Sequence, residues 1–73
     1  MKRALGRFIT VLWRLRSKGH RKRWTNPRGQ LFEEDTQHGE LEKYNDRGKH
    51  EGSVDPDTGE VIKDPVRGRT IEV

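Results

Sequence analysis

The chain has 73 residues, of which 27% are hydrophobic and 38% are charged, so it can form at most one small domain with a thin core. It contains no cysteine, which excludes a disulfide framework and any site built on a thiolate. The sequence predicts no membrane span, and the arginines at positions 7, 14 and 16 interrupt the early apolar residues and argue against a secretion signal.

The net charge of +4 conceals an uneven distribution along the chain. Residues 1–30 carry ten Lys or Arg and no acid, whereas residues 31–73 carry six Lys or Arg and twelve Asp or Glu. A strongly basic first part indicates a polyanionic partner. The alternative is that the two parts neutralise each other.

The first element that the sequence predicts is an amphipathic basic helix over residues 4–16, within an N-terminal segment of residues 1–19. Apolar residues recur there at helical spacing, namely Leu5, Phe8, Ile9, Leu12 and Leu15. We expect this helix to pack on a sheet. Binding to a membrane surface or in the groove of a partner are the alternatives.

Beyond Gly19 the chain is divided by four short groups that each end in glycine: NPRG at 26–29, TQHG at 36–39, NDRG at 45–48 and PDTG at 56–59. A type I turn followed by a left-handed glycine closes a three-residue hairpin loop in this way. The sequence therefore predicts a twisted antiparallel meander with strands near 20–25, 30–35, 40–45, 49–55, 60–64 and 69–72. The expected fold is α+β but mainly β, a single compact domain in which residues 20–73 form the sheet.

These loops set a strand register. It pairs an aromatic row, Trp24 with Phe32, Phe32 with Tyr44 and Tyr44 with His50, and a row of alternating charge, Arg23 with Glu33, Glu33 with Lys43 and Lys43 with Glu51. The same register places Glu42 opposite Glu34. Repulsion between these two carboxylates would raise the pKa of one of them, which suits a general base near neutral pH. His38 lies in the turn beside them. Strict alternation directs Asp35 to the other face, so either a bulge in the turn redirects it or its role is indirect.

The segment HRKRWT at 20–25 combines cations with an indole ring. Phosphate contacts together with a stacking surface are typical of proteins that bind single-stranded RNA. A charged edge strand that discourages aggregation is the alternative. The residues that we assign to RNA binding are Arg21, Lys22, Arg23, Trp24, Arg28, Lys43 and Arg67.

A histidine and carboxylates beside an RNA-binding segment favour cleavage of RNA without a metal ion. A base would remove the proton of the ribose 2′-OH, an acid would protonate the leaving 5′-oxygen, and a cation would stabilise the phosphorane. The three histidines, His20, His38 and His50, lie on different segments with no metal-ligand spacing, so we expect no metal and no other cofactor.

Four segments together carry a family resemblance: RKRWT at 21–25, DTQHGELEKY at 35–44, SVDPDTGE at 53–60 and RTI at 69–71. In this order and spacing, about residues 20–71 resemble the cytotoxic ribonuclease domain of ribosome-inactivating colicins and cloacin. The resemblance implies a twisted antiparallel sheet with a short helix. It also implies metal-independent cleavage of small-subunit ribosomal RNA at the decoding site, in the cytoplasm, and inhibition by an acidic immunity protein or antitoxin.

Matched by position, the resemblance assigns catalysis to four residues, Asp35, His38, Glu42 and Arg69. Glu42 would be the general base and Arg69 the cation at the phosphorane. His38 would be the acid or a proton-sharing partner, and Asp35 would orient or polarise His38. Two departures stand out: Glu34 replaces an aromatic residue before the aspartate, and Arg67 competes with Arg69 as the catalytic cation.

Other interpretations remain open at this point. The chain could be an excised toxin domain or a free-standing toxin, and the initiating methionine favours the second slightly. It could also be a non-catalytic protein that binds RNA or the ribosome, or a membrane-active basic peptide with a soluble tail.

Overall fold

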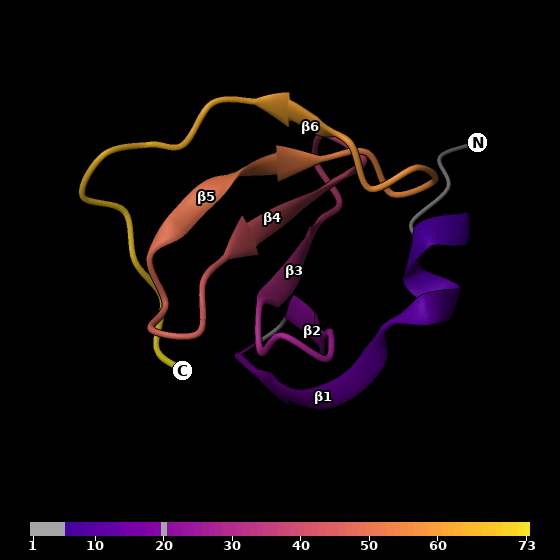
Figure 1. Cartoon of the computed structure of the whole chain (residues 1–73), viewed down its shortest axis with the longest axis horizontal. Helices are drawn as coiled ribbons and strands as arrows, with labels where there is room; N and C mark the ends of the chain where they lie inside the picture. The colour runs from indigo at the N-terminus through magenta and orange to yellow at the C-terminus, as the bar shows by residue number, and fades with distance from the viewer. Residues whose placement is uncertain (1–5, 20) are drawn as a thin grey trace.

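The computed structural model describes residues 6–19 and 21–73, which form one antiparallel sheet (Figure 1). Its elements are the 3-10 helix η1 (Arg7–Val11) and the strands β1 (Trp13–Lys18), β2 (Arg21–Thr25), β3 (Leu31–Asp35), β4 (Glu40–Tyr44), β5 (His50–Val54) and β6 (Val61–Lys63). The strands neighbour one another in chain order. The predicted meander is therefore confirmed from β2 to β6, whereas β1 lies before the residues, 20–73, that were expected to form the sheet. Within the described residues, no helix is long and apolar enough to span a membrane.

The predicted N-terminal helix is wrong over the part of residues 4–16 that the structure describes. A 3-10 helix of five residues is followed directly by β1, which pairs with β2 at the edge of the sheet. Residues 1–5, including Leu5, lie outside the described chain. The sequence FITVLW at 8–13 consists mostly of β-branched and aromatic residues, which are weak helix formers. Its apolar spacing is helical, but its residue types favour an extended chain.

Contacts with a distant turn hold η1 in place. The backbone N–H of Phe8 donates to the carbonyl oxygen of Pro56 at 2.8 Å, and the N–H of Arg7 donates to Oδ1 of Asp57 at 3.0 Å. In Figure 1, η1 lies beside the loop between β5 and β6. Docking on this loop, rather than a helical repeat, therefore fixes the beginning of the described chain.

One face of the sheet carries the apolar core. Its buried members are Ile9, Trp24, Phe32, Leu41 and Val54, and Phe8 and Leu12 pack against them. The rings of Phe8 and Phe32 meet edge to face with centroids 5.4 Å apart. The residues from η1 thus close the core over the first strands, the role that was expected of a helix.

The predicted register is confirmed between β2 and β3 and, next to the turn at 45–48, between β4 and β5. Trp24 pairs with Phe32, and Tyr44 pairs with His50. The predicted pair of Arg23 with Glu33 is also present.

The other predicted pairs are wrong, for two reasons. The loop between β3 and β4 is one residue longer than expected, so Phe32 pairs with Lys43 and Glu33 pairs with Glu42. A bulge in the pairing of β4 with β5 places Lys43 opposite Gly52 instead of Glu51.

Asp35 explains the longer loop. Its carbonyl oxygen accepts the N–H of Gly39 at 2.8 Å, and its carboxylate accepts the N–H of His38 at 3.2 Å. These two bonds close a four-residue loop, 36–39, between Asp35 and its strand partner Glu40. A side-chain acceptor that caps nearby backbone donors is a familiar property of aspartate in turns.

A shift of one residue in an antiparallel pair exchanges the two faces of a strand. Glu34 therefore lies opposite Leu41, whereas Glu42 lies opposite Glu33. Asp35 is two residues beyond Glu33 and shares its face. The shift thus brings Asp35 to the same face as Glu42, and the expectation that they face apart is wrong.

The C-terminal segment, residues 64–73, is an extended strap rather than the predicted strand at 69–72 (Figure 1). A single bridge pairs Lys49 with Thr70, and the N–H of Ile71 donates to the carbonyl oxygen of Gly48 at 2.8 Å. Gly48 has a φ of 87°, and a side chain at this position would collide with the backbone of Ile71. Glycine at the turn therefore permits the close approach of the C-terminal segment.

Candidate active site

A pocket of about 310 Å³ opens on the face of the sheet opposite the apolar core. It is lined by Arg21, Asp35, Gln37, His38, Glu42, His50, Ser53, Lys63, Asp64, Val66 and Arg69. These residues come from β2, β3, β4, β5, β6, the loop 36–39 and the C-terminal segment. The structure therefore brings all four residues that were expected to be catalytic to one pocket.

The first pair in the pocket is His38 and Asp35. Nδ1 of His38 lies 2.8 Å from Oδ2 of Asp35. Burial raises the pKa of the Asp35 carboxyl, but hydrogen bonds from the side chain and backbone of His38 and the charge of that ring outweigh it, so the pKa falls below its usual value. An ionised Asp35 accepts the Nδ1 proton and leaves Nε2 of His38, whose side chain is 52% exposed, to act on a bound molecule.

One carboxylate oxygen of Glu42 contacts two hydrogen-bonding side chains and one cation. Its Oε1 lies 2.6 Å from Nε2 of His50, 3.2 Å from Oγ of Ser53 and 3.7 Å from Nη1 of Arg69. These contacts orient the carboxylate. Glu42 is itself only 4% exposed, so the surrounding side chains fix its position.

His50 is a site residue that sequence reasoning missed. The backbone N–H of Val66 donates to Nδ1 of His50 at 2.9 Å, so the ring proton sits on Nε2 and is donated to Glu42. No motif marks this histidine, although the predicted pair of Tyr44 with His50, which is present, places it on the face of Glu42, one row away. Sequence reasoning assigned it to the aromatic row and gave it no part in the site.

Arg69 is the arginine of the C-terminal segment that reaches the pocket. Its Nη1 is 3.7 Å from Glu42, whereas Arg67 lies in an exposed turn and does not line the pocket. Tyr44 is fully buried on this face, with its ring 5.1 Å from that of His50. Burial raises the pKa of the Tyr44 hydroxyl, although the charge of Arg69 opposes the shift, so this phenol stays neutral at physiological pH.

The carboxylate that faces Glu42 across the strands is Glu33 rather than the predicted Glu34. Its charge is balanced, because Nε of Arg23 lies 3.0 Å from Oε2 of Glu33 and Nη1 of Arg21 lies 3.7 Å from Oε1. The predicted repulsion between Glu34 and Glu42 is therefore wrong, because the change of register separates them onto opposite faces.

The residues assigned to RNA binding take different positions. Arg21 lines the pocket, Lys22 and Arg28 are exposed, and Lys43 lines a second cavity of about 570 Å³ beside Lys49. Trp24 is 4% exposed in the core, so it does not present a stacking surface, and Arg23 is 8% exposed and bonded within the protein. Trp24 lies on the face of β2 that forms the core, and Arg21 and Arg23 lie on the other face.

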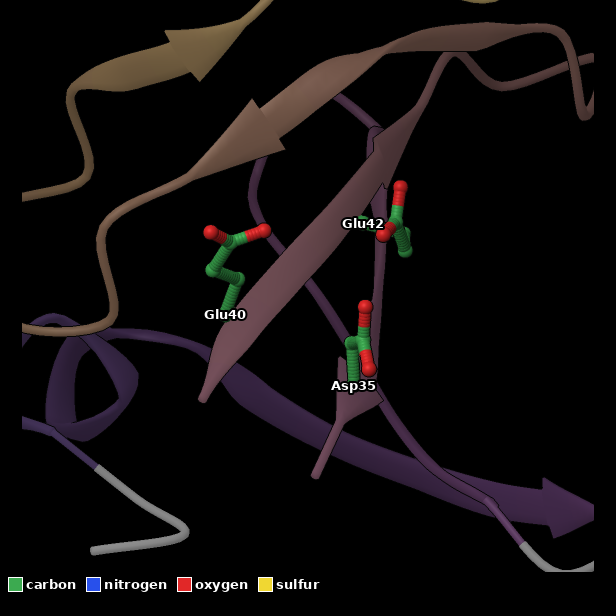
Figure 2. Close-up of side chains that lie close together, drawn as sticks. All are labelled: Asp35, Glu40 and Glu42. Atoms are coloured by element: carbon green, nitrogen blue, oxygen red, sulfur yellow. The ribbon is translucent and has the colours of Figure 1, made fainter. Parts of the chain in front are cut away.

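Three carboxylates gather at the meeting of β3 and β4, and Figure 2 shows them as Asp35, Glu40 and Glu42. One oxygen from each lies within 4.8 Å of the others. Each already has a basic neighbour: His38 for Asp35, Lys63 at 3.1 Å for Glu40, and His50 for Glu42. Sequence reasoning considered only histidines as metal ligands and missed this cluster, and the expectation of a metal-free site stays a prediction.

The fold and the pocket define a small single-sheet domain with a preformed acid–base centre. The chain belongs to the Cytotoxic family, whose model matches residues 14–72. Over 56 residues it is 50% identical to colicin E3, 45% identical to colicin-E6 and 43% identical to cloacin, all from Escherichia coli. These matches cover 74% of this chain but only 10% of each relative, so the chain spans about a tenth of their length. The family match also includes β1, which the sequence resemblance left out.

Proposed function

We propose that this chain is a toxin ribonuclease that cuts small-subunit ribosomal RNA at the decoding site and so blocks translation in the cytoplasm. Membership of the Cytotoxic family supports this proposal. The observation that carries it is the placement of Glu42 and His38, each held by its own partner, in one pocket with Arg69. Two positioned proton-transfer groups and a cation are the requirements of RNA cleavage by the substrate's own 2′-OH.

The reaction begins at Glu42. Its carboxylate removes the proton of the ribose 2′-OH, and the 2′-oxygen then attacks the adjacent phosphorus. His50 keeps the carboxylate in place through the 2.6 Å contact. The carboxylate needs no metal-bound water for this step, because the nucleophile belongs to the substrate.

The second half of the reaction falls to His38 and Arg69. Nε2 of His38 protonates the leaving 5′-oxygen while Asp35 supports the charged ring from Nδ1. Arg69 stabilises the charge that builds up on the phosphorane oxygens. The bond between phosphorus and the 5′-oxygen breaks, which leaves a 2′,3′-cyclic phosphate on the upstream fragment and a 5′-hydroxyl on the downstream one.

Mapping the 3′ ends of ribosomal RNA after incubation of purified protein with ribosomes tests this function. The proposal predicts one dominant new end in the small-subunit RNA, produced in the presence of EDTA if the RNA keeps its fold. Tight binding to ribosomes with no new end would support the non-catalytic RNA-binding alternative instead. Leakage from anionic vesicles would indicate the membrane-active one.

The charge distribution favours an acidic inhibitor protein that covers residues around 21–25 and the pocket. Association of such a pair should be fast and should slow steeply as salt rises, because attraction between opposite fields is screened over about 10 Å at 0.1 M salt. Stopped-flow measurement of the association rate between low and high salt checks this. A rate that does not depend on salt, with a basic inhibitor, would contradict it.

A substitution of His50 tests whether its contact with Glu42 orients the proposed general base. We expect His50→Ala to reduce the rate constant for cleavage by about 10- to 100-fold, since a carboxylate that loses its orienting partner loses productive geometry. Single-turnover rates with ribosomes measure the effect. The control is Glu60→Ala, a truncation at an exposed position outside the pocket. An equal rate for both variants would show that His50 has no part in the site.

A further inference from the structure

Arg23 joins three parts of the fold from a buried position. Its Nε bonds to Oε2 of Glu33 at 3.0 Å, and its Nη1 donates to the carbonyl oxygen of Glu72 at 2.7 Å. Arg23 is 8% exposed, so its guanidinium is not available to a phosphate. The residue that the sequence assigned to RNA binding instead links β2, β3 and the end of the C-terminal segment.

The C-terminal segment depends on a few such links, because it belongs to no strand. Arg69 lies three residues before Glu72, and its carbonyl oxygen accepts the N–H of His50 at 3.0 Å. Between them, Ile71 bonds to Gly48. Arg23 therefore holds the segment at Glu72, on the C-terminal side of Arg69, whose guanidinium lies beside Glu42.

We propose that Arg23 is a positioning residue that anchors the C-terminal segment to the sheet so that Arg69 keeps its place at the pocket. This proposal rests on the proposed function, since it assigns Arg23 an effect on the step that Arg69 assists. A guanidinium has the planar fork to serve Glu33 and Glu72 at once, whereas the single ammonium of a lysine does not. The anchor thus requires arginine and not merely a positive charge.

The test is a double-mutant cycle on Arg23→Lys and Arg69→Ala, read as single-turnover cleavage rates with ribosomes. Arg23→Lys should slow cleavage by about tenfold, because a displacement of a catalytic group by about 1 Å is enough for such a loss. In the Arg69→Ala background, Arg23→Lys should change the rate by less than about twofold, since residues that act through one another are not additive. Arg47→Lys makes the same exchange at an exposed turn position and should cleave like the wild type.

A readout independent of activity accompanies the cycle. Arg23→Lys should accelerate hydrogen exchange at the Ile71 amide by about tenfold or more, through local release of the segment, and should leave the Leu41 amide in β4 unchanged. If Arg23→Lys does not fold, an ester in place of the peptide bond between Glu72 and Val73 weakens the acceptor and leaves the contact of Arg23 with Glu33 intact. The ester should accelerate exchange at Ile71 and slow cleavage in the same direction.

The outcomes separate this proposal from the function on which it rests. Equal slowing by Arg23→Lys with and without Arg69, or wild-type cleavage by Arg23→Lys, would overturn the anchor. So would unchanged exchange of the Ile71 amide in both the lysine and the ester variants. If Arg69→Ala itself cleaves like the wild type, the role of Arg69 in the proposed function fails, and the exchange of Ile71 still decides whether Arg23 holds the segment.

Discussion

Glu42→Gln should leave the fold intact and reduce the rate constant for ribosomal RNA cleavage by about 10²–10⁴, the usual value of general base catalysis. The amide is nearly the same size as the carboxylate and can still accept from His50 and Ser53, which both contact Oε1. It cannot accept the proton of a 2′-OH. Single-turnover kinetics with ribosomes measures the loss, and a thermal unfolding curve checks the fold.

The matched control for this substitution is Glu60→Gln, the same change at an exposed position outside the pocket. It should cleave at the wild-type rate. His38→Ala should lose a factor comparable to that of Glu42→Gln, because it removes the proposed acid. If Glu42→Gln and Glu60→Gln cleave equally fast, Glu42 is not the base.

Arg69→Ala should reduce the rate constant by about 10²–10³, since it removes a charge directed at the place where phosphorane charge develops. The side chain of Arg69 is 39% exposed, so its removal leaves no buried void and the fold should survive. The loss should appear mainly in the single-turnover rate at saturating protein and only weakly in binding.

Arg67→Ala is the control for Arg69→Ala, because it removes the same charge two residues away in an exposed turn. We expect it to change the rate by less than about threefold, the scale of a surface charge that only assists association. If Arg67→Ala loses most of the cleavage rate and Arg69→Ala does not, the C-terminal segment has been matched to the family in the wrong register.

The sheet was predictable because local chemistry specifies its turns. Glycines at fixed places in the turns give the strands β2 to β6 and their order. The predicted aromatic and charge rows were correct at only some of their pairs. The region of residues 7–16 was not predictable in the same way. Apolar spacing there suits an α-helix, but long-range contacts prevail. Phe8 and Arg7 bond to the loop at Pro56 and Asp57 from a short 3-10 helix, and the residues that follow pair with β2 as a strand.

The sequence predicted which residues would share a pocket but not their geometry, and their catalytic roles stay predictions. The family resemblance selected Asp35, His38, Glu42 and Arg69, and the structure brings them to one pocket. Their relative placement depends on the length of the loop 36–39. Because this loop is one residue longer than expected, Asp35 lies on the same face as Glu42.

The residues that support the pocket residues were harder to predict than the pocket residues themselves. His50 and Arg23 act through long-range contacts, with Val66 and with Glu72, that no short motif encodes. Neither residue stands near its partner in the sequence. Their roles therefore became visible only once the C-terminal segment was placed.

The most direct test of the mechanism replaces the ribose on the 5′ side of the mapped cut by 2′-deoxyribose. Since the 2′-oxygen is the proposed nucleophile, cleavage at that position should vanish, while the unmodified substrate should yield a 2′,3′-cyclic phosphate in the presence of EDTA. Cleavage of the deoxy substrate, with a 5′-phosphate on the downstream fragment and an absolute need for Mg²⁺, would indicate a metal-activated water. That result would contradict the roles of Glu42 as the general base and His38 as the general acid.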